Sequence, residues 1–324
     1  MIDGFGRKID YLRISVTDRC NLRCLYCMPE AGILHKPHED ILTFEEIIRI
    51  VEAGVFLGID KIRLTGGEPL VREGLVDLVS ALSVIKGLKD ISLTTNGILL
   101  KEYAQALKNA GLKRINVSLD SLKEARYRRI SRGGDLKEVI DGIEEAIKAG
   151  FTPLKINVLL LGDIEKKEIV DFLRLTIENS LCVRFLELMP VTSFYLQDKF
   201  ISSAIVMEIA EKIFPIEEIR VFGAGPAEVF KFKHALGSFG FISPMSNKFC
   251  SSCNRLRLSS DGILRPCLHS DSKVDLRQPL RQGRDEEEIR QIIEEAVKLK
   301  PKEHALDKKK SKTQSDFFMC SIGG

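Results

Sequence analysis

The chain has 324 residues, 44% of them hydrophobic, which is enough for one large core and a smaller second one. Its 49 Lys and Arg against 46 Asp and Glu leave a net charge of +3, too small to indicate a nucleic-acid or anionic-membrane partner. Any anion site must therefore be built locally. The chain lacks a run of roughly 18 apolar residues and its start lacks signal-peptide features, so we expect a cytosolic protein outside the membrane.

The first predicted strand, Tyr11 to Thr17, alternates apolar and polar side chains and leads directly into a loop with three cysteines. Cys20, Cys24 and Cys27 follow the spacing C-x3-C-x2-C. In a cytosolic chain such cysteines are more often metal ligands than disulfide partners. Three thiolates can hold a four-iron cluster and leave one iron open for another ligand. A zinc knuckle with its fourth ligand elsewhere is the alternative.

Behind this loop begins a regular alternation of strands and helices. Thr43 and Glu46 predict a capping box at the start of the first helix, and glycines follow most of the helical stretches. Further strands are predicted at Lys61 to Thr65, Ile91 to Asn96, Arg114 to Asp120, Leu154 to Leu161 and Val183 to Met189. This alternation indicates parallel βα units with their helices outside.

These strands each have one apolar and one polar face. Arg63 and Thr65, for example, alternate with Ile62 and Leu64. Parallel strands covered on both faces would be almost continuously apolar, so the polar faces must surround a wet cavity. We therefore predict an α/β fold, a partial and open (βα)6 barrel similar to a TIM barrel. An antiparallel sheet with one solvated face is the alternative, but it would not need the intervening helices.

The carboxyl ends of parallel strands are where such folds place their sites. The second strand ends in Thr65-Gly66-Gly67-Glu68-Pro69, where glycines let the backbone approach a ligand closely. Polar groups also end the later strands, at residues 94–97, 118–120 and 187–190. The chain has no Gly-x4-Gly-Lys-Ser/Thr sequence, so a nucleoside triphosphate would have to be bound without a P-loop.

After the last of these strands the alternation fades. We predict a barrel over residues 1–205, a smaller domain that caps it over residues 206–297, and a charged, mobile linker with a tail over residues 298–324. The tail ends in Phe-Phe-Met-Cys-Ser-Ile-Gly-Gly, and we expect so apolar an end to dock onto the protein. Cys182 and Cys320 are expected to be small buried hydrophobic residues.

The predicted second domain contains another group of three cysteines. Cys250, Cys253 and Cys267 follow the spacing C-x2-C-x13-C. They predict either a second iron-sulfur cluster with an open iron or a zinc site completed by His269. Two arginines at alternate positions behind the middle cysteine could clamp an anion. They are Arg255 and Arg257.

The cysteine loop, with an aromatic residue before its last cysteine, resembles that of the radical S-adenosylmethionine enzymes. The Gly-Gly-Glu-Pro turn, the second cysteine group and the terminal Gly-Gly narrow the resemblance to the GTP 3',8-cyclase family of molybdenum cofactor biosynthesis. The resemblance covers essentially the whole chain, including residues 11–20, 225–227, 240–245 and 253–257. It implies two [4Fe-4S] clusters, the first binding S-adenosylmethionine and the second binding the guanine of GTP. Their ligands would be Cys20, Cys24 and Cys27 for the first and Cys250, Cys253 and Cys267 for the second.

The resemblance also implies ligand contacts at motif positions. Contacts to S-adenosylmethionine would come from Tyr26, Gly67, Ser118 and Met189. GTP would be held by Arg13, Arg63, Thr94, Lys155, Arg255 and Arg257, the last two also being the catalytic candidates. Lys61 and Arg184 are weaker candidates, because alternation places Arg184 on the strand face opposite Glu187 and Met189 and a bulge would be needed. A triphosphate without a P-loop does need several cations.

The implied reaction begins with hydrogen abstraction from the ribose 3' carbon of GTP. Attack on purine carbon 8 and reduction then give (8S)-3',8-cyclo-7,8-dihydroguanosine 5'-triphosphate. Implied partners are a reductant protein and, downstream, cyclic pyranopterin monophosphate synthase, with the chain a monomer or homodimer and the tail reaching the active site.

One departure is residues 161–164, Leu-Gly-Asp-Ile, where the family usually has Arg-Gly-Val-Asn. The alternatives are a radical peptide maturase and a non-catalytic iron-sulfur or zinc protein.

Overall fold

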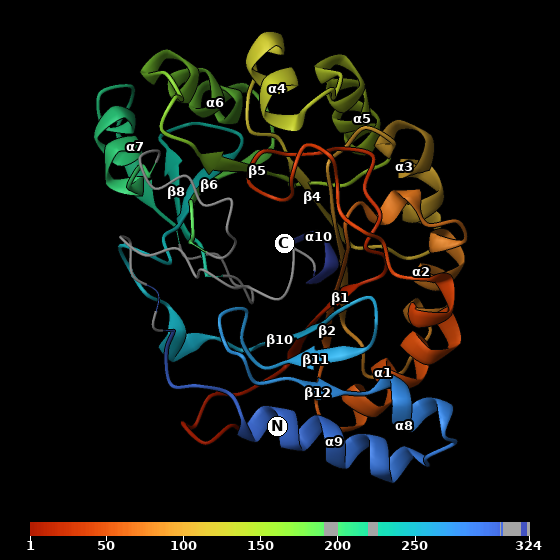
Figure 1. Cartoon of the computed structure of the whole chain (residues 1–324). Helices are drawn as coiled ribbons and strands as arrows, with labels where there is room; N and C mark the ends of the chain where they lie inside the picture. The colour runs from red at the N-terminus through yellow and green to blue at the C-terminus, as the bar shows by residue number, and fades with distance from the viewer. Residues whose placement is uncertain (191–199, 220–225, 305, 307–318, 323–324) are drawn as a thin grey trace.

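Six parallel strands, each followed by helical structure, form the first part of the fold (Figure 1). The computed structural model describes residues 1–190, 200–219, 226–304, 306 and 319–322. The six strands pair in chain order, and the predicted strand ends are correct to within two residues. This confirms the predicted partial (βα)6 barrel. The strands are β1 Tyr11–Ser15, β2 Lys61–Thr65, β3 Asp90–Thr95, β4 Arg114–Ser118, β5 Leu154–Leu160 and β6 Leu181–Glu187.

Helices cover the outside of this curved sheet (Figure 1). They are α1 Phe44–Phe56, α2 Leu75–Ser83, α3 Leu100–Asn109, α4 Glu124–Ser131, α5 Leu136–Lys148 and α6 Lys166–Glu178. The predicted capping box is present: the Glu46 amide donates to Thr43 Oγ1 at 3.2 Å, and the Thr43 amide donates to Glu46 Oε2 at 2.8 Å. The apolar faces of strands and helices pack into one continuous core.

The second part of the chain extends the same sheet at both of its edges. Strand β10 (Arg255–Leu258) pairs parallel with β1, while β9 (Ser238–Ile242) pairs parallel with β6. The full order is β12-β11-β10-β1-β2-β3-β4-β5-β6-β9-β8-β7. The remaining elements are α7 Ser203–Ala210, β7 Ile216–Glu218, β8 Glu228–Phe232, β11 Ile263–Arg265, β12 Val274–Asp275, α8 Arg277–Arg281 and α9 Glu286–Lys298. The second cysteine group is thereby brought beside the first barrel strand.

Aromatic packing joins this second part to the barrel. Phe185 of β6 lies with its ring centroid 6.3 Å from that of Phe241 on β9 and 6.3 Å from that of Phe172 on α6. Phe239 and Phe232, from neighbouring strands, are 4.8 Å apart. Phe232, Phe239 and Phe241 therefore belong to the main core.

The carboxyl-terminal residues return to the barrel. Residues Met319–Ile322 form a short helix, α10, which lies inside the ring of strands (Figure 1). The predicted docking of the tail is confirmed for these residues, whereas residues 317, 318, 323 and 324 lie outside the described part. Within the described residues, no helix has the length and apolar character that crossing a membrane requires.

The start of the predicted linker is anchored. Lys300 is 3% exposed, and its Nζ donates to the carbonyl oxygens of Arg255 at 2.7 Å and Pro266 at 2.6 Å. His304 is also buried, with Nε2 3.1 Å from the Pro244 carbonyl oxygen. The prediction of a mobile linker is therefore wrong for residues 299–304, because a lysine-rich composition did not reveal that one lysine has buried partners. Residues 307–312 lie outside the described part.

Candidate active site

A cavity of about 280 Å³ lies among the inner strand faces and the loops at their carboxyl ends. Its volume is close to the lower end of the range for small-molecule sites. About half of the polar strand side chains that the alternation placed on the inner face line it, in agreement with the predicted polar interior. From the strands these are Arg13, Arg63, Thr65, Thr94, Ser118 and Asn157.

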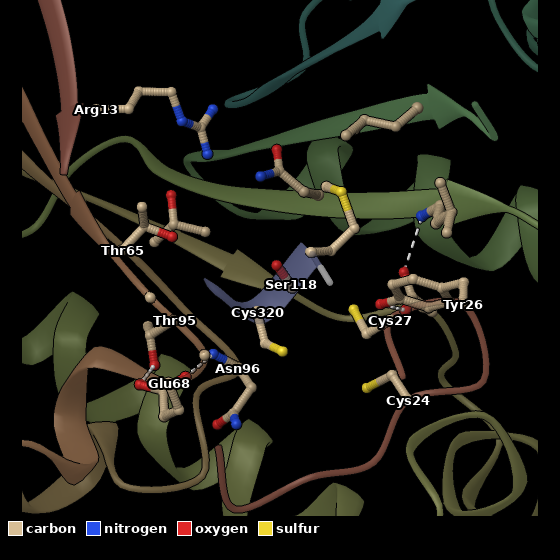
Figure 2. Close-up of a pocket in the computed structure, with 18 of the residues that line it drawn as sticks. Arg13, Cys24, Tyr26, Cys27, Thr65, Glu68, Thr95, Asn96, Ser118 and Cys320 are labelled. Carbon is tan, nitrogen blue, oxygen red and sulfur yellow. Dashed lines mark hydrogen bonds between the residues drawn. The ribbon is translucent and has the colours of Figure 1, made fainter. Parts of the chain in front are cut away.

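Three thiols of the first cysteine loop reach one end of this cavity. Cys20, Cys24 and Cys27 all line it, and Figure 2 shows Cys24 and Cys27 close together. Burial raises the pKa of Cys20 to about 11 and also raises the pKa values of the other two thiols. Iron binding would displace the thiol protons, as metals do at thiolate sites. Three thiols on one partly enclosed surface fit a thiolate-bound cluster.

The aromatic residue of the loop is held by a buried carboxylate. Tyr26 donates its hydroxyl hydrogen to Asp120 Oδ2 at 2.6 Å, and the Leu159 amide donates to Asp120 Oδ1 at 2.8 Å. Asp120 follows strand β4, so one carboxylate connects the cysteine loop to two neighbouring strands. The sequence marked this strand end as polar but assigned no role to Asp120.

The Gly-Gly-Glu-Pro turn packs directly against the backbone that leads into Cys20. The Gly67 amide donates to the Thr17 carbonyl oxygen at 2.8 Å, and the Glu68 amide donates to that of Arg19 at 2.8 Å. A Cβ atom on Gly67 would lie only 2.2 Å from the Arg19 carbonyl oxygen. This close approach, which no other residue allows, explains why glycine is required there.

The glutamate of this turn connects it to the end of β3. Glu68 is buried and accepts hydrogen bonds from Thr95 Oγ1 at 2.7 Å and from the Asn96 amide at 2.7 Å (Figure 2). Burial raises the pKa of Glu68 to about 7. Asn96 in turn donates from Nδ2 to Asn21 Oδ1 in the cysteine loop at 2.7 Å. The sequence indicated polar loops at both segments, but it carried no signal that Glu68 and Asn96 link them.

Cations gather deeper along the strands. Arg13, Arg63, Arg184 and Arg255 line the cavity, and Figure 2 shows Arg13 at a distance from the cysteine loop. Arg257 is the register partner of Arg13 across β1 and β10 and is buried. Such a concentration of positive charge inside a protein is costly unless an anion neutralises it.

Several of these polar groups lack partners in the described part of the chain. The Arg184 Nε, Thr94 Oγ1 and Asn157 Oδ1 atoms are buried without a hydrogen bond there. Lys155 does not line the cavity itself, but it is buried, and burial followed by the charges of Arg184 and Arg114 lowers the pKa of Lys155 to about 7. These groups fit a polyanionic ligand with further hydrogen-bonding atoms.

Two sequence-based expectations change here. Lys61 does not line the cavity, because its Nζ lies 2.9 Å from Asp10 and 3.2 Å from Asp60, which neutralise its charge. Arg184 does face the cavity without any bulge, since β5 and β6 pair in unbroken register. The strand ends at Glu187, so alternation no longer governs Met189, which lines the cavity as well.

The second cysteine group lies in a cationic environment. Burial raises the pKa of Cys253, but the charges of Arg255 and Lys300 and hydrogen bonds from Arg255 lower it to about 6. The His269 ring lies 5.2 Å from that of His304, centroid to centroid. Among the residues that the structure describes, no three His, Cys, Asp or Glu side chains lie close enough together to hold a single ion.

Comparison with known proteins places the chain in a family. Residues 14–176 match the model of the radical SAM superfamily, and residues 181–306 match that of Molybdenum Cofactor Synthesis C. The GTP 3',8-cyclase of Peptoclostridium acidaminophilum is 52% identical over 95% of this chain and 94% of its own length. That of Alkaliphilus metalliredigens is 49% identical over 100% of both chains. The chain belongs to the GTP 3',8-cyclase family. This confirms the resemblance found in the sequence.

Membership of the radical SAM superfamily implies a [4Fe-4S] cluster and S-adenosylmethionine. Among solved structures, Streptococcus suis SuiB bound to S-adenosylmethionine has a TM-score of 0.63 at 16% identity, covering 84% of this chain and 64% of that chain. At that identity the likeness shows the fold alone.

In the segment that departs from the GTP 3',8-cyclase pattern, Asp163 forms an ion pair with Arg126 at 3.1 Å. The departing loop is thus attached to helix α4.

Proposed function

We propose that this member of the GTP 3',8-cyclase family converts GTP to (8S)-3',8-cyclo-7,8-dihydroguanosine 5'-triphosphate in molybdenum cofactor biosynthesis. One observation carries the proposal. A single cavity is lined by the three-cysteine loop and by arginines from β1, β2, β6 and β10. The thiols suit a cluster and the arginines suit a triphosphate, so both reactants can meet in one enclosed space.

The first cluster is assigned to Cys20, Cys24 and Cys27. S-adenosylmethionine would be contacted by residues that all line the cavity, namely Tyr26, Gly67, Ser118 and Met189. When bound, the cluster and S-adenosylmethionine supply the deoxyadenosyl radical that abstracts hydrogen from the ribose of GTP. The protein orients these groups through the Asp120 and Glu68 hydrogen bonds, which hold the cysteine loop and the glycine turn against the strand ends.

GTP is assigned to the cationic part of the cavity. The chain has no P-loop whose backbone amides could bind the triphosphate. The arginine side chains must therefore neutralise its charge directly. The proposed contacts are Arg13, Arg63, Thr94, Lys155, Arg184, Arg255 and Arg257, the first and the last being register partners. Lys61 is left out because Asp10 and Asp60 already neutralise it.

A second [4Fe-4S] cluster at Cys250, Cys253 and Cys267 would bind the guanine of GTP. Two features support this assignment: Cys253 precedes Arg255, which lines the cavity, and β10 runs beside β1. Zinc completed by His269 is the competing interpretation, and metal analysis separates the two. Cys250, Cys253 and Cys267 lie outside the residues that line the cavity, so guanine would reach this centre past Arg255.

The electron donor, the downstream enzyme and the cellular location are proposed from the family. Electrons would come from a reductant protein, and the product would pass to cyclic pyranopterin monophosphate synthase, in the cytosol where thiols stay reduced. We propose residues 1–205 as the radical SAM barrel, residues 206–297 as the cluster domain and residues 298–324 as the tail, in a monomer or homodimer.

The proposal is tested in anaerobically reconstituted protein. Reductant and S-adenosylmethionine are added with or without GTP, and deoxyadenosine and nucleotide products are quantified. GTP-dependent deoxyadenosine together with a cyclised nucleotide is the expected result. Deoxyadenosine release that ignores GTP would retain the radical enzyme but refute GTP as substrate. Iron, sulfide and zinc measured on the same sample decide the identity of the second centre.

A further inference from the structure

A fourth thiol lies at the first cysteine loop. Cys320 of helix α10 is 4% exposed and lines the same cavity as Cys20, Cys24 and Cys27. Figure 2 shows its sulfur turned toward Cys24 and Cys27. The four thiols therefore lie around one end of a single cavity.

Helix α10 is anchored so that this thiol is positioned. Ile322 is buried and packs with Leu268, and Met189 and Met319 pack against that pair. The helix also contacts strand β1, which leads into the cysteine loop. Cys320 is therefore held in place by apolar contacts of residues on either side of it in the sequence.

The cysteine loop supplies three ligands to a cluster that needs four, so one iron is open to exchange. A thiol at that position is the ligand that iron-sulfur clusters use most often. We propose that Cys320 ligates the open iron while S-adenosylmethionine is absent, and that S-adenosylmethionine displaces it. Helix α10 would then close the cluster site of the resting enzyme against water and oxygen.

The exchange involves no change of oxidation state. As the iron-sulfur bond forms, Cys320 releases its proton to solvent and a water ligand leaves the iron. When the amino and carboxylate groups of S-adenosylmethionine bind, that bond breaks and the thiol takes up a proton. A four-residue helix held by a small apolar cluster is a low-stability element that a chelating ligand can displace.

Cys182 provides a matched control. It is equally buried, at 4% exposed, but lies on β6 as the register partner of Lys155 and does not line the cavity. Cys320→Ala suits a helix, because alanine has the highest helix propensity. Both variants remove one buried thiol and should fold.

The experiment compares wild type, Cys320→Ala and Cys182→Ala after anaerobic reconstitution to equal iron content. Electron paramagnetic resonance spectra of the reduced proteins are recorded without GTP, before and after adding S-adenosylmethionine. The loss of cluster absorbance to a chelator is followed in parallel. Signals from a second centre would be common to all three proteins and would cancel in the difference spectra.

We expect Cys320→Ala to change the spectrum and to lose its cluster several-fold faster without S-adenosylmethionine, while Cys182→Ala behaves as wild type. With S-adenosylmethionine bound, all three should coincide. Identical spectra before its addition, or a difference that persists afterwards, would overturn the proposal. Because GTP is absent throughout, this result is independent of whether GTP is the substrate.

Discussion

The two cysteine groups offer the same donors in opposite electrostatic surroundings. Burial raises the pKa of Cys20 to about 11, and the nearby Glu68 carboxylate acts in the same direction. Cys253 is buried too, yet the charges of Arg255 and Lys300 bring its pKa down to about 6. The neighbours of a thiol, more than the spacing of its motif, therefore determine its state.

Under the proposed function, this difference suits the two ends of the fold to different tasks. The first loop relies on its metal to deprotonate the thiols, and backbone contacts hold it in place. At the second group, Arg255 and Lys300 stabilise the thiolate of Cys253 and would also attract a nucleoside triphosphate. The first end is suited to generating a reactive species, and the second to retaining the substrate.

The strongest test of this comparison removes one thiol from each group. Cys27→Ala should abolish deoxyadenosine formation, because the first cluster loses a ligand. Cys253→Ala should keep an intact first cluster but form no cyclised nucleotide and only the GTP-independent background of deoxyadenosine, because only the second centre is impaired. Both products are quantified by liquid chromatography, with Cys182→Ala as control. Normal cyclisation by Cys253→Ala would end the assignment of a substrate role to that group.

The backbone contact of the first loop is tested next. In Gly67→Ala the new Cβ would approach the Arg19 carbonyl oxygen to 2.2 Å, so the turn must move away from the cysteine loop. Displacements near 1 Å in an active site cost about 10²-fold in rate, and we expect deoxyadenosine formation to fall on that order. Gly4→Ala, which has open space around its Cβ, should be unaffected. Equal rates for the two variants would contradict this account of the turn.

Replacing Lys300, the buried lysine whose charge acts on Cys253, is expected to lower stability to an intermediate degree. Lys300→Met leaves the carbonyl oxygens of Arg255 and Pro266 without their donor, at about 1–3 kcal/mol for each unsatisfied group. The melting temperature should fall, and iron should be lost from the second centre before the first. Lys298→Met, on the exposed face of α9, serves as control. Retained stability and full iron content would show that Lys300 is dispensable there.

The smallest expected effect is a pH dependence of GTP binding. Burial lowers the pKa of Lys155 to about 7, and a bound triphosphate would raise it, so binding takes up a proton. Affinity should therefore be fully present below pH 7 and fall above it, by up to about tenfold per pH unit. Lys155→Gln should bind more weakly and with a flatter pH profile, measured by calorimetry, while Lys298→Gln keeps the wild-type profile. A steep profile in Lys155→Gln would assign the proton to another group.

Much of the fold could be predicted from local sequence signals. Strand alternation located the six barrel strands and their inward polar faces, and the Thr43–Glu46 pair located a helix start. The spacing of Cys20, Cys24 and Cys27 pointed to a cluster site that the family comparison supports. These signals lie within a few residues of one another, where backbone geometry alone determines which side chains share a face.

Contacts between distant segments were decided only by the tertiary structure. Lys61 and Arg63 share one strand face, yet acidic neighbours neutralise Lys61 while Arg63 lines the cavity. Lys300 comes from a charged stretch and Cys320 from an apolar one, and neither stretch has a periodic pattern. Lys300 nevertheless lies near Cys253, and Cys320 lines the same cavity as the first cysteine loop. Local patterns identify which residues can point inward, but only the packing of segments far apart in the chain determines which charges and thiols meet.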